Sequence, residues 1–142
     1  MYRLKIFAAA LLIGATASAA AAKDPSEIFA AHDPHGRLPN TSIERLGEIK
    51  VDRATFAIFY LTFVNPVSQH GQHRIAIIGD DNQFEGSFQC WLREGGAKLA
   101  IGKDRLTVRE GDMQFVVRFD RNGPTRKAKA LCGEGSGWEN SI

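Results

Sequence analysis

Histidine is the residue type in this chain whose spacing most readily suggests chemistry. Its four copies fall as two pairs, His32-x-x-His35 and His70-x-x-His73. Imidazole is a common ligand of zinc and copper at neutral pH. In a flat strand residues three apart point to opposite faces, so a shared ion requires the turns that neighbouring proline and glycine residues indicate. One hypothesis is therefore a Zn²⁺ or Cu²⁺ site at these histidines, whereas the leading interpretation requires no cofactor.

The two cysteines, Cys90 and Cys132, are predicted to form a disulfide. An isolated pair in an oxidising compartment is most simply a disulfide. Both cysteines fall on the inward positions of alternating segments, and Cys90 shares its predicted face with Phe84 and Phe88. The alternative, a reactive thiol pair, is less supported because the chain has no Cys-x-x-Cys motif.

Two features indicate a surface for a partner. Trp91 opposes the inward positions of its segment and is expected to be exposed, and Trp138 near the end of the chain is interpreted similarly. Arg126, Lys127 and Lys129 form a locally basic cluster suited to an anionic surface. The alternative for the cluster is that its lysines prevent a terminal strand from pairing with other chains. The expected partner is a protein or a small apolar ligand.

Signatures of catalysis are weak. Gly102-Lys103 lacks the preceding glycine of a phosphate loop, and Ser136 lacks the glycine that a nucleophile elbow needs at position 134. We therefore expect a non-catalytic binding or interaction module. A histidine-based metal-binding protein is the alternative, and a small periplasmic enzyme of unknown class is the second alternative.

Residues 1–22 have the features of a secretory signal peptide. Arg3 and Lys5 precede an apolar run, and small residues follow it at Ala17-Ser18-Ala19 and up to Ala22. The mature chain is expected to begin near Ala20 or Lys23, to be periplasmic or secreted, and to contain no transmembrane segment. The two basic residues leave with the signal, so 18 basic residues become 16, equal to the 16 acidic ones. The formal charge of +2 therefore gives no support for a nucleic-acid partner, and none is expected.

Residues 23–132 are predicted to form a single β-rich domain. Thr55–Val64 is apolar at both alternating sets of positions, which predicts a strand covered on both faces. Asp24-Pro25 predicts the start of a helix that ends near Ala31. Short alternating segments joined by turns predict a small antiparallel barrel or sandwich of about seven strands with one short N-terminal helix. Residues 133–142 are glycine-rich and are expected to form a flexible tail.

Overall fold

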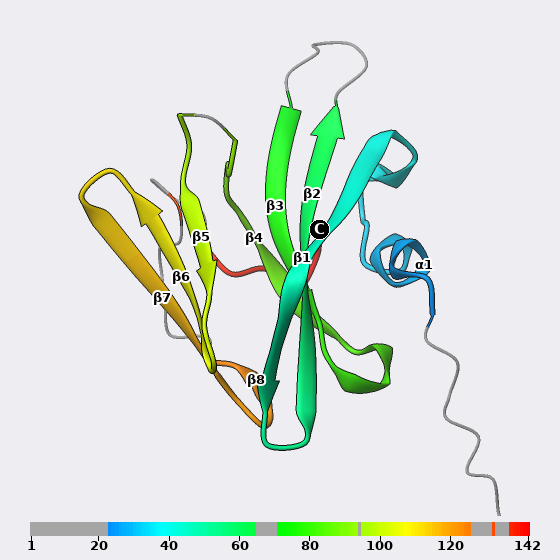
Figure 1. The fold of residues 1–142 in the computed structure, drawn as a ribbon. Coiled ribbons are helices and arrows are strands. Elements are labelled where there is room, and N and C mark those ends of the chain that lie inside the picture. Colours follow the sequence, from blue (N-terminus) through cyan, green and yellow to red (C-terminus); the bar gives the residue numbers. More distant parts are fainter. Residues whose placement is uncertain (1–22, 65–70, 94, 126–131, 133–136) are drawn as a thin grey trace, which may run out of the picture.

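Two antiparallel sheets make up most of the protein (Figure 1). The computed structural model describes residues 23–64, 71–93, 95–125, 132 and 137–142. Within these residues the two sheets have four strands each, do not close into a barrel, and lie in a sandwich-like arrangement. The predicted mainly β fold with one short helix is confirmed.

Each sheet is a simple meander in which consecutive strands are neighbours. The strands of the first sheet are β1 (Thr41–Val51), β2 (Ala54–Val64), β3 (Gly71–Ile78) and β4 (Phe84–Gln89). The strands of the second sheet are β5 (Lys98–Ile101), β6 (Arg105–Glu110), β7 (Met113–Asp120) and β8 (Gly123–Pro124). Two short 3₁₀ helices, η1 (Leu38–Asn40) and η2 (Asp80–Asn82), lie in the connections.

The helix α1 (Pro25–Ala30) covers the face of the first sheet that points away from the second sheet (Figure 1). Its start is fixed as the sequence predicts, because the Asp24 side chain accepts a hydrogen bond from the Ser26 N–H. Phe29 is fully buried and packs edge-to-face on Phe59 of β2, with ring centroids 5.5 Å apart. The helix therefore anchors itself to the sheet through an aromatic contact.

Strand β2 is buried on both faces, which confirms the prediction from its two apolar sets of positions. Its Phe56, Ile58 and Tyr60 lie in a core shared with the second sheet. Its Phe59, Leu61 and Phe63 lie in an outer core beneath α1. We call these the inter-sheet core and the outer core. The buried residues of the inter-sheet core are Ile49, Phe56, Ile58, Tyr60, Ile75, Ile77, Phe88, Cys90, Ala97, Leu106, Val108, Val117 and Phe119. The buried residues of the outer core are Ile28, Phe29, Phe59, Leu61, Phe63, Ala76, Ile78 and Ile142.

The position of Phe84 differs from the expectation. Its alternation with Phe88 and Cys90 predicts one shared face, but Phe84 packs against the outer core while Phe88 and Cys90 lie in the inter-sheet core. The reason is an irregularity between β3 and β4, where Ile77 pairs with Gly86 and Ile78 with Phe84. One extra residue in β4 reverses the face of every residue before it.

Residues 137–142, which we call the C-terminal segment, pack against both cores. Ile142 is only 1% exposed and belongs to the outer core, and Trp138 packs against Phe88 of the inter-sheet core. These two large apolar side chains supply the buried area that stabilises the contact of the segment with the sheets. Residues 1–22, 126–131 and 133–136 lie outside the described residues, so the expectations for the signal peptide and for most of the last strand stay predictions.

Helices in the described part of the chain are all too short or too polar to cross a membrane.

Candidate functional site

Three aromatic rings gather where β3 meets the end of β4. The His73 imidazole stacks on the Tyr60 ring, with centroids 5.6 Å apart and planes 12° apart. The Trp91 indole is the second aromatic neighbour of His73. Its ring centroid is 6.4 Å from that of His73, and the two planes are tilted by 30°. Antiparallel pairing produces this arrangement, because Thr62 is opposite His73 and Tyr60 is opposite Ile75. We call Tyr60, His73 and Trp91 the aromatic patch.

The patch ranges from buried to open. Tyr60 is 4% exposed and Trp91 is 50% exposed, with His73 between these extremes. The backbone around Trp91 is fixed on both sides: the Cys90 N–H donates to the His73 carbonyl at 2.9 Å, and the Ala97 N–H donates to the Trp91 carbonyl at 2.7 Å. A large apolar side chain is thus held in the open by an ordered backbone.

The polar groups of the patch are held in uncharged forms. The Tyr60 hydroxyl accepts a hydrogen bond from the Leu92 N–H at 3.1 Å, and burial raises the pKa of this phenol. Burial, with a smaller contribution from the Arg93 charge, lowers the pKa of His73 below its ordinary value. At neutral pH the patch therefore presents an indole, a neutral imidazole and a neutral phenol, with Arg93 as the nearby charge.

The disulfide predicted from the sequence is confirmed. Cys90 and Cys132 are bonded, with Cα atoms 5.2 Å apart. Cys90 is 2% exposed in the inter-sheet core, as its inward position predicts. The bond fixes the end of β4 immediately before Trp91, and it fixes the chain six residues before Trp138.

Among the described residues, His32 and His73 lie on opposite sides of the first sheet. His32 packs on the Phe84 ring at 4.4 Å and its Nδ1 lies 2.9 Å from the Ile28 carbonyl oxygen, on the outer-core side of the first sheet. His73 lies on the inter-sheet side, and His35 is exposed after the helix. Within the described ranges no three His, Cys, Asp or Glu side chains form a group suited to a metal ion. His70 lies outside these ranges, so a shared site of His70 and His73 stays a prediction.

Of the residues expected to contact a partner, Trp138 and Trp91 can be placed. Trp138 is half-buried and packs against Phe88, so its expected exposure is wrong. Trp91 differs. It is exposed, as its position in the alternation indicates. Arg126, Lys127 and Lys129 fall in the segment 126–131, outside the described residues, and their role stays a prediction.

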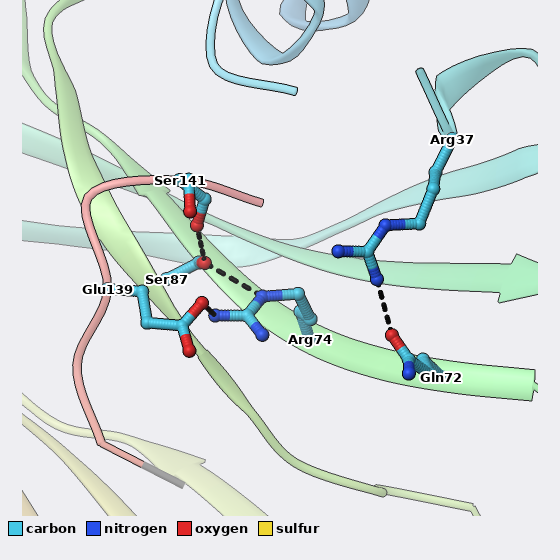
Figure 2. A network of polar contacts seen from close by, with 6 residues as sticks. All are labelled: Arg37, Gln72, Arg74, Ser87, Glu139 and Ser141. Carbon is cyan, nitrogen blue, oxygen red and sulfur yellow. Dashed lines mark hydrogen bonds and ion pairs between the residues drawn. The ribbon is translucent and has the colours of Figure 1, made fainter. Parts of the chain in front are cut away.

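Sequence reasoning missed a buried arginine on the outer face of the first sheet. Arg74 Nε donates to Ser87 Oγ and Arg74 Nη2 donates to Glu139 Oε2, both at 2.9 Å (Figure 2). The Arg74 side chain is 8% exposed, and burial lowers its pKa, opposed by the Glu139 charge. The signal in the sequence was an arginine at the head of the apolar run 74–78, which needs an acidic partner when buried.

The surroundings of Arg74 complete this polar network. The Ser87 hydroxyl donates to the Ser141 carbonyl oxygen, and on the opposite side Arg37 Nη1 donates to Gln72 Oε1 (Figure 2). The Arg37 guanidinium also lies over the Phe63 ring, 5.4 Å from its centroid. The polar network thus connects β3, β4 and the C-terminal segment, and Arg37 borders it.

Comparisons of this chain with protein-family models, with curated proteins and with solved structures found no match.

Proposed function

We propose that the protein is a secreted or periplasmic, non-catalytic interaction module that binds a partner protein through the aromatic patch. The observation that carries the proposal is Trp91, whose indole is 50% exposed beside the stacked rings of His73 and Tyr60. Residues that dominate protein interfaces are enriched in tryptophan, tyrosine and arginine. The patch combines two of these types with Arg93 nearby.

The order of the patch supports the proposal energetically. Association must offset the entropy lost when flexible side chains and loops become fixed. The hydrogen bonds of Cys90 and Ala97 fix the backbone on both sides of Trp91 before any partner arrives. The stack of His73 on Tyr60 then supports the indole from one side. A partner therefore gains the buried area of the indole at a small ordering cost.

The disulfide and the leader-like sequence support the location. Cys90 and Cys132 form a disulfide. Disulfides persist in oxidising compartments. The apolar run in residues 1–22 fits export to such a compartment. Both features agree with a periplasmic or extracellular partner.

Site-specific photo-crosslinking in cells tests the proposal. A photoreactive phenylalanine derivative replaces exposed Arg93, and a control chain carries it at Met113 of β7, which is 52% exposed. We expect a defined protein adduct from position 93 and none from position 113. Adding Trp91→Ala should reduce the adduct at least tenfold, because interface hot spots contribute about 2 kcal/mol or more. Equal adducts from both positions, or an adduct that Trp91→Ala leaves unchanged, would contradict the proposal. Retention of a small apolar molecule in native mass spectrometry, lost in Trp91→Ala, would replace the protein partner with a ligand.

A further inference from the structure

The second sheet has a positively charged outer face, which points away from the first sheet and is separate from the aromatic patch (Figure 1). Leu106 and Val108 of β6 and Val117 of β7 lie in the inter-sheet core. Because side chains alternate along a strand, the residues between them point to solvent. The basic residues at these outward positions form what we call the cationic face: Lys98, Arg105, Arg109 and Arg118.

The four cations form two like-charged pairs on neighbouring strands. Lys98 of β5 is directly opposite Arg109 of β6. Arg105 of β6 is directly opposite Arg118 of β7. Like charges in directly opposite positions destabilise a sheet. The fold therefore keeps two unfavourable pairs on one outer face, and packing within the chain gives no reason for them.

Acidic side chains meet this face only at its border. Arg105 Nε donates to Asp104 Oδ1 at 2.9 Å, and Asp104 lies in the turn before β6. Asp120 is the last residue of β7. Within the part of the chain that the structure describes, the other three cations of the face have no acidic partner at ion-pair distance: Lys98, Arg109 and Arg118.

The first sheet treats its exposed cations differently. Glu48 of β1 pairs with Arg45 at 3.0 Å and with Lys50 at 3.2 Å. Residues 23–93, which include α1 and the first sheet, contain seven basic and nine acidic side chains. Residues 95–125, which include the second sheet, contain six basic and four acidic ones. Positive charge is thus concentrated on the second sheet of a chain that is balanced overall.

Protection of a sheet edge does not account for the cationic face. A lysine on an edge strand keeps that edge from pairing with other chains, and Lys98 lies on the edge strand β5. The three arginines lie on β6 and β7, which have a neighbouring strand on both sides. Their charge therefore needs another explanation, and an anionic partner provides one.

We propose that the cationic face binds an anionic membrane surface. Lipid phosphate groups supply the negative charge that the face lacks, and each basic residue near such a surface adds to the attraction. A membrane fits better than a folded protein because the row between the two cationic pairs has no large side chain to anchor a protein interface. That row consists of Ala100, Thr107 and Val116.

Binding of the full chain to lipid vesicles tests the proposal. The probe is a vesicle of phosphatidylcholine with roughly one-third phosphatidylglycerol, at low ionic strength. Vesicles of pure phosphatidylcholine measure any binding through the apolar run in residues 1–22, and this amount is subtracted. We expect Arg109→Gln/Arg118→Gln to lower the partition coefficient roughly twenty-five-fold, which is about fivefold for each basic residue removed. Both positions are exposed, so the variant should fold, and far-ultraviolet circular dichroism checks this.

Two further variants make the result specific. Arg45→Gln/Lys50→Gln removes the same charge from the first sheet and should lower binding by no more than about threefold. Arg109→Lys/Arg118→Lys should bind within about twofold of the wild type, because a lipid surface attracts either cation, whereas a discrete anion site depends on the planar guanidinium. The proposal is overturned if the wild type shows no excess binding to the anionic vesicles, if both glutamine variants lose binding equally, or if the lysine variant loses it.

Discussion

The two tryptophans of this protein both lie near β4 and have different surroundings. Trp138 packs over Gly86 and beside Phe88, so the absence of a side chain on β4 makes room for its indole. Trp91 follows the end of β4 and is 50% exposed, with the His73 ring on one side. The same residue type therefore stabilises the fold in one region and remains available for binding in the other.

The residues that lie beside each indole determine its role. A glycine on β4 accommodates Trp138, whereas the rings of His73 and Tyr60 fill the space beside Trp91 and leave its other side open. Both regions depend on the Cys90–Cys132 bond, which precedes each tryptophan along the chain. Changes that weaken one region and spare the other should therefore be possible, and changes to the disulfide should affect both.

Removal of the disulfide should have the largest effect. The bond joins residues 42 positions apart, so the chain-entropy model gives a stabilisation of about 4 kcal/mol. We expect the Cys90→Ser/Cys132→Ser variant to lose about this much free energy of unfolding in urea titrations. A loss below about 1 kcal/mol would show that the bond constrains neither region.

Matched alanine substitutions should separate the two regions. Trp138→Ala should lower the free energy of unfolding by about 3 kcal/mol, because it leaves a cavity over Gly86 and Phe88. Trp91→Ala should change it by no more than about 0.5 kcal/mol, as expected for an exposed side chain. Urea unfolding followed by far-ultraviolet circular dichroism measures both. Similar losses for the two variants would remove the distinction.

A smaller effect should appear in the pH dependence of stability. Burial lowers the pKa of His73, so the folded state binds fewer protons than the unfolded state as the pH falls. The stability of the neutral form is fully present above about pH 6.5, the ordinary pKa of histidine, and declines as the pH falls through the folded-state pKa. His73→Gln should therefore lose less stability than the wild type between pH 7 and pH 5.

Replacement of the exposed His35 by glutamine provides the control for removing a histidine. Thermal unfolding at pH 5, 6 and 7 makes the comparison. If the stability of the wild type and that of His73→Gln fell equally between pH 7 and pH 5, the folded patch would not lower the pKa of His73.

Much of the fold could be predicted because local patterns have local causes. The apolar residues at both sets of positions in β2 predicted its two covered faces, and Asp24 with Pro25 predicted the helix start. The cysteine pair was predicted from its isolation in a chain with a leader-like sequence and from the inward positions of both residues, and the bond is present. Each of these inferences needs only the alternation of one segment or the chemistry of a few adjacent residues.

What could not be predicted depends on contacts between distant segments. The register irregularity between Ile77 and Ile78 moved Phe84 to the other face, and no residue type marks such a position reliably. The partnership of Arg74 with Glu139 spans 65 positions in the sequence. The aromatic patch likewise requires β2, β3 and the end of β4 to be paired before Tyr60, His73 and Trp91 meet.

Fluorescence quenching of single-tryptophan variants tests the distinction between the two regions most directly. The chain has two tryptophans, so Trp138→Phe reports on Trp91 alone and Trp91→Phe reports on Trp138 alone. We predict that Trp91 emits at longer wavelength and that acrylamide quenches it several-fold more strongly than Trp138. Equal quenching of the two indoles, or stronger quenching of Trp138, would contradict the assignment of one to the fold and the other to binding.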